Sequence, residues 1–191
     1  MPDRPTQILE AAARLIARRG VRGLRVEEVS AEAGVSTALI YYHFKDRTGL
    51  LRRTLEFINR RAVRYTDAAF DVSDDPRTQL TEILLRELQD APDVRENSAA
   101  WGELRATAVF DPDLRELLAT ATREWNDDLA GLIHRAREAD PALSGVDARA
   151  AAERLTALVE GVSERWLSGT TSLQRAHELI RGAVDAELRP A

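Results

Sequence analysis

A short stretch near residue 40 gathers side chains that could bind a nucleic acid. Residues 34–50 read GVSTALIYYHFKDRTGL. In a helix, Leu39, Ile40 and Phe44 would share an inward face. The other face would carry hydroxyl, aromatic and cationic groups, namely Thr37, Ala38, Tyr41, Tyr42 and His43, followed by Lys45 and Arg47. These groups suit contact with phosphates and base edges, and an ordinary helical hairpin with a solvated face is the alternative.

The residues before this stretch predict how it is positioned. Residues 26–33 have a helical pattern with Val29 and Ala33 on one face. Gly34 follows where the C-terminus of a helix favours a left-handed residue, and Ser36 is a good N-cap for the next helix. Two short helices joined by such a turn make a helix-turn-helix, whose second helix can enter the DNA major groove.

The run G-V-S-x-x-x-I-Y-Y-H-F-x-x-R-x-x-L strongly resembles the DNA-binding signature of the TetR (tetracycline-repressor-like) transcriptional regulators. The match covers roughly the first third of the chain and extends upstream through Ile8, Ala12, Leu15, Gly20 and Val29. The chain departs from the family pattern at two positions. Arg25 stands where the family usually has a Thr or Ser that caps the second helix, so this helix start is less well satisfied. Ala38 stands where a Gly is common, and this difference bears on the operator.

The resemblance implies a set of DNA contacts at the matching positions. Thr37, Ala38 and Tyr41 would meet base edges or a thymine methyl group. Phosphate contacts are expected from Ser36, Tyr42, His43, Lys45 and Arg47.

The charge of the chain is divided unevenly along its length. The net charge is -5, which alone would argue against DNA binding. Residues 1–65, however, hold 13 Lys or Arg against 7 Asp or Glu, whereas residues 66–191 hold 14 against 25. A basic first third is attracted to phosphate while an acidic remainder is held away from it.

Apolar periodicity predicts an all-α fold of about nine helices, with no strand-like alternation. The expected helices cover residues 3–19, 26–33, 36–44, 45–70, 76–89, 95–109, 113–139, 147–167 and 172–188. We expect a three-helix DNA-binding domain at 1–47 and a helical ligand-binding and dimerisation domain at 48–191, and the long helix from residue 45 links the two. The sequence DVSDDP at 71–76 is the clearest break.

The last two helices combine wide apolar stripes with small residues. Gly161 and Ser163 are small enough for close approach of another helix. An antiparallel pair at the end of the chain suits a four-helix bundle with the same pair of a second subunit, as in proteins that this chain resembles. A homodimer can read two half-sites on one face of a duplex.

The C-terminal part carries all three tryptophans, which makes a small-molecule pocket a reasonable hypothesis. The predicted ligand-binding residues are Trp101, Arg105, Trp125 and Trp166, and plain helical core is the alternative for each tryptophan. In proteins that this chain resembles, a bound ligand tilts the linking helix and moves the paired recognition helices out of register with the DNA. The segments WGELRATA, DPDLRELL and LVEGV also resemble the C-terminal domain of the BetI-like branch of the family.

Other classes of function find little support in the sequence. There is no cysteine, so a disulfide or a thiol nucleophile is impossible, and the charged amphipathic start and the short apolar runs favour a cytoplasmic protein. No Glu-x-x-His pair precedes His43, His134 or His177, and no phosphate loop or nucleophile elbow is present. We therefore expect no enzyme, no cofactor and no metal. A helical adaptor that binds protein through the motif region is the other rival.

Overall fold

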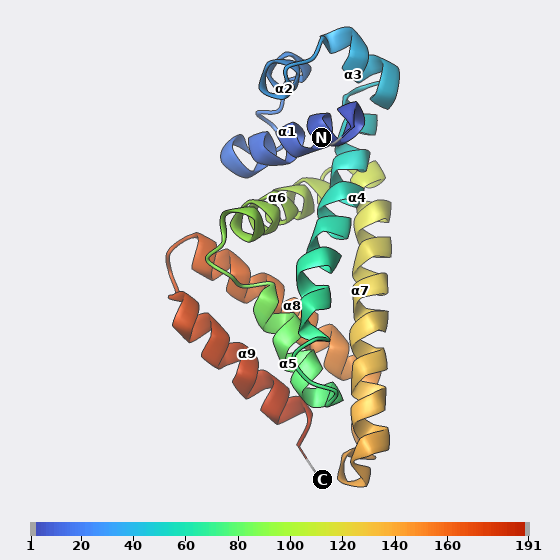
Figure 1. The fold of residues 1–191 in the computed structure, drawn as a ribbon, viewed down its shortest axis with the longest axis vertical. Coiled ribbons are helices and arrows are strands. Elements are labelled where there is room, and N and C mark those ends of the chain that lie inside the picture. Colours follow the sequence, from blue (N-terminus) through green and yellow to red (C-terminus); the bar gives the residue numbers. More distant parts are fainter. Residues whose placement is uncertain (1–2, 190–191) are drawn as a thin grey trace. The chain divides into compact units, whose positions relative to one another are not determined.

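The chain is helical along almost all of its length. The computed structural model describes residues 3–189. Within that range it contains nine α-helices and two short 3-10 turns but no strand, which confirms the all-α prediction. The helices are α1 (Arg4–Arg19), α2 (Val26–Ala33), α3 (Thr37–Phe44), α4 (Arg47–Thr66), α5 (Pro76–Arg86), α6 (Pro92–Ala108), α7 (Pro112–Ala139), α8 (Ala148–Leu167) and α9 (Leu173–Glu187) (Figure 1). None of these helices is long and apolar enough to cross a membrane.

Several helices begin at a residue whose side chain caps the first turn. The caps are Asp3, Ser36, Asp75, Asp147 and Ser172, and each accepts a hydrogen bond from the backbone N–H three residues further on. Such bonds satisfy N–H groups that have no partner within the helix. The caps therefore explain why these helices start where they do.

Three helices differ from the predicted ranges by more than one residue at an end. Helix α5, which we expect to run to residue 89, ends at Arg86. The helix expected at 45–70 begins only at Arg47, because the backbone at Lys45 has a positive φ that no helix accommodates. It ends at Thr66, where a 3-10 turn over Asp67–Ala69 takes over. In α6 the start lies earlier than expected, at Pro92, because a proline fits the first turn of a helix.

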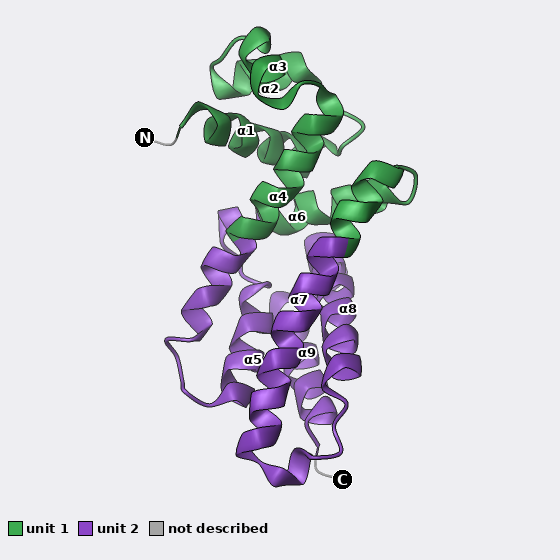
Figure 2. Cartoon of the chain, turned by 90° about the vertical axis from the view of Figure 1, so that its right-hand side faces the viewer, with its two compact units in different colours: residues 1–61, 96–119 green, residues 62–95, 120–191 purple. Residues whose placement is uncertain are grey.

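The chain forms two compact units that do not follow the order of the sequence. Unit 1 comprises residues 1–61 and 96–119, and unit 2 comprises residues 62–95 and 120–191 (Figure 2). Each boundary falls inside a helix, namely α4, α6 and α7. The two domains that we expect, residues 1–47 and 48–191, are defined by their functions and not by their internal contacts. This division of the chain stays a prediction.

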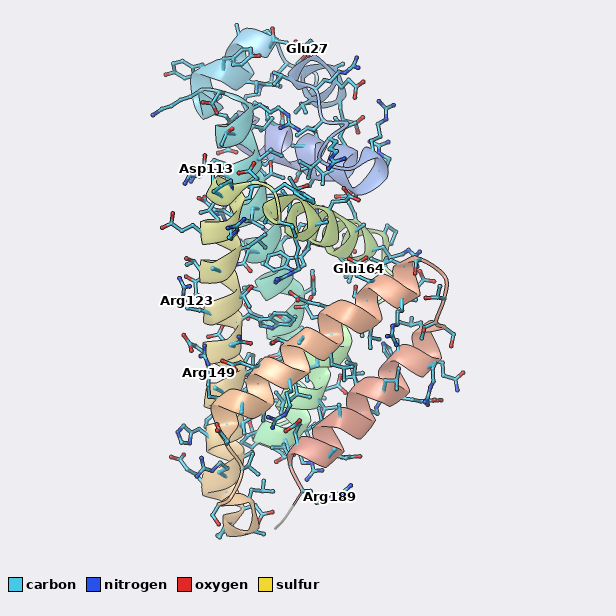
Figure 3. The ribbon with its side chains drawn as sticks, turned by 180° about the vertical axis from the view of Figure 1, so that it is seen from behind. Glu27, Asp113, Arg123, Arg149, Glu164 and Arg189 are labelled. Carbon is cyan, nitrogen blue, oxygen red and sulfur yellow. The ribbon has the colours of Figure 1, made fainter. Side chains whose placement is uncertain are left out.

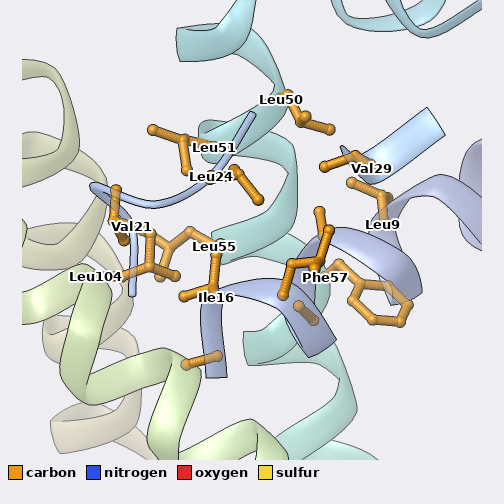
Figure 4. Close-up of a cluster of buried hydrophobic side chains, with 14 of the residues drawn as sticks. Leu9, Ile16, Val21, Leu24, Val29, Leu50, Leu51, Leu55, Phe57 and Leu104 are labelled. Carbon is orange, nitrogen blue, oxygen red and sulfur yellow. The ribbon is translucent and has the colours of Figure 1, made fainter. Parts of the chain in front are cut away.

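Unit 1 is built around a core to which its two chain segments both contribute. The apolar residues of α1 recur at helical spacing and are buried, with Ile8, Leu9, Ala12, Leu15 and Ile16 all at most 5% exposed. Leu51 and Leu55 of α4 join this core from one side and Leu104 of α6 joins it from another (Figure 4). The first three helices, the part of α4 up to Arg61 and residues 96–119 thus share one hydrophobic core.

Unit 2 contains the end of α4, α5, most of α7, and the pair α8 and α9. Helix α9 packs against both α5 and α8, and its buried residues Ile180 and Val184 lie one turn apart. Arg149, labelled in Figure 3, pairs with Asp127 of α7 and with Glu153 one turn further along α8.

Glu87 directly follows α5 in unit 2, where the residue is half-buried and its carboxyl group is desolvated. The Glu87 Oε2 atom accepts a hydrogen bond of 3.0 Å from the Tyr65 hydroxyl. Burial raises the pKa of Glu87 from 4.5 to about 7, although the Tyr65 hydrogen bond acts in the opposite direction. The folded chain therefore keeps a proton on Glu87 at pH values at which the unfolded chain has lost it. Stability must fall as the pH rises from about 4.5 to 7.

We predict that Glu87→Gln removes this pH dependence. The neutral amide has the same shape but needs no proton, so the variant should be more stable than the parent chain at pH 8 by about 1–3 kcal/mol, and the two should converge near pH 4.5. Denaturant unfolding at a series of pH values measures both effects. Glu138→Gln, which removes an exposed carboxylate from α7, is the control. Parallel pH profiles for the parent chain and Glu87→Gln would contradict the assignment.

Candidate nucleic-acid interface

The turn between α2 and α3 has the hydrogen bonds of a Schellman motif. Gly34 ends α2 in the left-handed region, with φ 65° and ψ 37°. Its N–H donates to the Ala31 carbonyl at 3.3 Å, and the Val35 N–H donates to the Ser30 carbonyl at 3.0 Å. Val35 also packs against the core of unit 1, which is the apolar contact that often accompanies this motif. These contacts set the direction in which α3 leaves α2.

Helix α3 has one buried face and one exposed face. The Ser36 hydroxyl caps its start by accepting a hydrogen bond of 3.2 Å from the Leu39 N–H. Ile40 and Phe44 are buried one helical turn apart, whereas Leu39, which we expected beside them, is half-buried, as is Thr37. The side chains of Ile40 and Phe44 therefore pack α3 against the hydrophobic core of unit 1.

The opposite face of α3 presents the predicted contact residues to solvent. The exposed set is Ser36, Ala38, Tyr41, Tyr42, His43 and Lys45. Tyr42 is 80% exposed, which is the highest value among the exposed large hydrophobic side chains, and the His43 ring stands edge-on to it with ring centroids 5.0 Å apart. Within unit 1, α3 lies at the end far from α6 (Figures 1 and 2). Its outer face is thus free of neighbouring helices of this unit.

A strained turn separates α3 from α4. Lys45 has φ 67° and ψ -55°, and it is the only non-glycine residue with a positive φ in the described part of the chain. The Asp46 N–H donates to the Phe44 carbonyl at 2.8 Å, so the three residues form a γ-turn. Such a backbone costs on the order of 1–3 kcal/mol and persists only where its surroundings enforce it. Lys45 is also the only lysine of the chain.

The start of α4 lies directly against the end of α3. The Asp46 Oδ1 atom accepts a hydrogen bond of 2.7 Å from the Gly49 N–H and so caps α4. A Cβ atom on Gly49 would lie 2.1 Å from the Phe44 carbonyl oxygen. Because no side chain fits there, the close approach of the two helices requires glycine at this position.

Arg47 ties this junction to the loop between α1 and α2. Its Nε donates to the Leu24 carbonyl at 3.2 Å and its Nη2 donates to the Val21 carbonyl at 2.5 Å. Two of the three guanidinium nitrogens are therefore engaged within the protein. The position of Arg47 in the motif predicts a phosphate contact, and its two hydrogen bonds to the loop add a positioning role.

Three of the arginines of α1 are held by carboxylates of α2. Arg14 and Arg18 both bind Glu32, at 2.9 and 2.8 Å, and Arg19 binds Glu28 at 2.9 Å. In contrast, the side chains of Tyr42 and Lys45 make no hydrogen bond or ion pair with any residue between 3 and 189. Tyr42 and Lys45 therefore remain available for phosphate contacts at the end of α3.

The four predicted pocket residues are divided between the two units. In unit 1, Trp101 is half-buried on α6 and the Arg105 guanidinium lies 5.5 Å from its ring centroid. In unit 2, Trp125 is half-buried on α7, and Trp166 is buried on α8 with the Arg95 guanidinium 4.8 Å from its ring centroid. Each tryptophan packs against the core of its own unit. The pocket stays a prediction.

Sequence reasoning missed two polar features. Glu87 lies two positions after the apolar run ILL at 83–85, and a carboxylate in such a setting is a signal that could have been noticed. The pairing of Arg47 with loop carbonyls had no local signal, because its partners lie more than 20 positions away. Among the described residues, no group of three or more His, Asp or Glu side chains is arranged to hold a metal ion.

Two protein-family models match this chain. The model described as bacterial regulatory proteins, tetR family, matches residues 8–54, which span α1 to the start of α4. The model described as BetI-type transcriptional repressor, C-terminal, matches residues 76–189.

Relatives are found over nearly the full length. The HTH-type transcriptional regulator BetI of Burkholderia thailandensis is 29% identical over 98% of this chain and 94% of its own length. BetI of Pseudomonas paraeruginosa is 30% identical over 88% of this chain and 82% of its own length.

Solved structures agree with the family models. A protein from Rhodococcus sp. assigned to the TetR-family regulators is 46% identical, with a TM-score of 0.90 over 98% of this chain and 100% of its own. A transcriptional regulator from Saccharomonospora viridis, crystallised in complex with choline, is 26% identical, with a TM-score of 0.81 over 95% of both chains. Helix-turn-helix geometry, family models and relatives agree, and the chain belongs to the TetR family of bacterial transcriptional regulators, with a C-terminal domain of the BetI type.

Proposed function

We propose that the chain is a homodimeric repressor that binds operator DNA through α3 and leaves it when a small molecule binds. The observation that carries this proposal is the exposed outer face of α3, where Tyr42 and Lys45 make no hydrogen bond or ion pair with residues 3–189. Tyrosine hydroxyl and cationic groups without an internal hydrogen-bond or ion-pair partner are suited to the phosphate backbone. The cytoplasm is the compartment that such a function requires.

The contacts that we propose follow from the position of each side chain. Thr37, Ala38 and Tyr41 meet base edges or a thymine methyl group in the major groove. The phosphate contacts are made by Ser36, Tyr42, His43, Lys45 and Arg47. For Arg47 the phosphate would meet the third guanidinium nitrogen, because the other two donate to loop carbonyls.

We predict that Tyr42→Ala and Lys45→Ala weaken binding to all DNA sequences alike, whereas substitution of Thr37 changes the preference among operators. Loss of one phosphate contact should lower affinity roughly tenfold at low salt, and for Lys45→Ala it should reduce the salt slope by about one. Gel-shift titration against the DNA upstream of the gene, at several salt concentrations, measures both.

The matched control for these variants is Val109→Ala, which removes an exposed apolar side chain away from α3. Unchanged binding by Tyr42→Ala would refute its assignment. Parent affinity that does not respond to salt would favour the protein-binding adaptor over a DNA-binding regulator.

The dimer that we propose uses the outer faces of α8 and α9. Their inner stripes are already buried within unit 2. The outer faces carry exposed small residues one turn apart, namely Ala157 and Gly161 on α8, and Gly182 and Ala186 on α9. A Cβ atom on either glycine would have no atom within 4 Å apart from the adjacent residues and the backbone of its own helix. Such faces allow the close approach of two more helices, as a four-helix bundle needs.

We predict that Gly161→Arg converts the dimer to a folded monomer. The new side chain has room in the single chain but places a charge in the proposed interface. Light scattering coupled to gel filtration should give half the parent mass, and operator affinity should fall more than tenfold because two half-sites are no longer bound together. Ala139→Arg, at an exposed position near the end of α7, should leave both unchanged. A dimeric Gly161→Arg variant would exclude this interface.

The effector that we propose is a small molecule bound by residues of the aromatic set Trp101, Arg105, Trp125 and Trp166. The structurally similar regulator from Saccharomonospora viridis is bound to choline, and quaternary ammonium groups are held by aromatic faces. A ligand that prefers the DNA-free form by about a hundredfold would supply roughly 2.7 kcal/mol, which is enough to release an operator of ordinary affinity.

We predict that choline chloride at millimolar concentration raises the protein concentration needed for half-maximal operator binding at least tenfold. Sodium chloride at equal concentration controls for ionic strength and should have a much smaller effect. Equal responses to the two salts would remove choline as an effector, and the same titration then screens other small molecules.

A further inference from the structure

The loop between α1 and α2, residues 20–25, forms hydrogen bonds with two residues of unit 1 that lie far from it in the sequence, Arg47 and Glu103. The backbone of one residue, Val21, takes part in both contacts. Its N–H donates to the Glu103 Oε2 atom of α6 at 3.3 Å, and its carbonyl accepts from Arg47 Nη2 at 2.5 Å. A single peptide segment thus connects α6 to the junction between α3 and α4.

The contact with α6 is tight at the neighbouring residue. Gly20 has φ 74°, and a Cβ atom built on it would lie 2.6 Å from Glu103 Oε2. The carboxylate therefore occupies the space that a side chain at residue 20 would fill. Directly beyond Glu103, Leu104 is fully buried and belongs to the same core cluster as Val21 and Leu24 (Figure 4).

The turn after α6 contacts the same loop. Phe110 is 75% exposed, and the Arg22 guanidinium lies 6.0 Å from its ring centroid. Arg115 of α7 holds this turn in place by donating to the Val109 carbonyl at 3.1 Å. The loop 20–25 is therefore in contact with both α6 and the turn that follows it.

The other side of the loop leads to the DNA-binding face. Arg47 is the first residue of α4 and lies two positions after Lys45, whose γ-turn ends α3. A change in the position of the loop carbonyls must displace Arg47 or break its hydrogen bonds. The strained turn beside it has little freedom to absorb such a displacement.

We propose that Glu103 and Arg47 are positioning residues that transmit the position of α6 to the recognition helix through Val21. The route runs from the Glu103 carboxylate to the Val21 peptide groups, then to the Arg47 guanidinium and the turn at Lys45. Every contact in this route lies within unit 1, so the route can exist whether or not the protein binds DNA. Its effect on operator binding rests on the DNA-binding function proposed above. It would operate in addition to any tilt of α4.

The test uses Lys45 as a reporter, because it is the only lysine of the chain. Reductive methylation with 13C-formaldehyde labels its Nζ, keeps its charge and gives an NMR signal at the end of α3. The spectra to compare are those of the full chain, Glu103→Ala, Arg47→Met and the double variant. Hydrogen exchange of the Val21 amide is measured in parallel, and it reports directly whether the Glu103 bond is lost.

We expect Glu103→Ala to speed exchange at Val21 and to shift the Lys45 methyl signal in the same direction as Arg47→Met. The double variant should show little further shift, because both substitutions interrupt one route. Operator affinity of Glu103→Ala should fall roughly three- to tenfold, although Glu103 itself lies on α6. Glu56→Ala, which removes a carboxylate that pairs with Arg53 on α4 itself, should leave the Lys45 signal unchanged.

Two results would overturn the proposal. One is a Lys45 signal that does not move when Val21 exchange accelerates, which would mean that the bond exists but transmits nothing. The other is unchanged Val21 exchange in Glu103→Ala, which would mean that the bond is absent in solution. A parent chain that fails to bind DNA, but shows the expected coupled shifts, would instead count against the proposed function alone.

Discussion

The carbonyl group of Phe44 is the constraint on which the DNA-binding end of the molecule depends. It accepts a hydrogen bond from the Asp46 N–H, and the backbone of Gly49 lies directly against it. The ring of Phe44 is buried in the core of unit 1, so the end of α3 is fixed from inside. With that face fixed, helical geometry turns Tyr41 and Tyr42 outward. The proposed contact face is therefore exposed because the Phe44 ring is buried and the Phe44 carbonyl is held between Asp46 and Gly49.

Much of this end of the chain could be predicted from local sequence. A glycine after an apolar helical pattern predicts the left-handed residue that Gly34 adopts, and a serine two positions later predicts the cap that Ser36 provides. Period-3.6 spacing likewise predicts the buried stripe of α1. These features depend on residues within one or two helical turns, and local chemistry is enough to determine them. Nothing in the identity of Lys45, however, indicates a positive φ, because that conformation is imposed by the two helices on either side.

Contacts between distant segments were beyond sequence reasoning. The hydrogen bonds of Arg47 to loop carbonyls and of the Val21 N–H to Glu103 depend on tertiary packing. From the sequence, Arg47 could be recognised only as a cation in a motif. Residues 96–119 complete the core that the first helices form. The order and spacing of residues along the sequence do not indicate this either. For Trp101 and Trp166 the sequence identifies large aromatic groups but cannot say that they belong to different units. A ligand pocket inferred from composition therefore needs binding data more than the DNA-binding face does.

The single lysine has a practical consequence for any assay that attaches the protein to a surface. Amine-reactive sensor chips and resins couple proteins through lysine side chains, and here the only such side chain stands at the end of the recognition helix. Molecules coupled through it would be held with α3 toward the matrix, and they would seem unable to bind an operator. Immobilising the DNA instead, or coupling the protein through a cysteine introduced in unit 2, avoids this artefact, because the natural chain has no cysteine to compete.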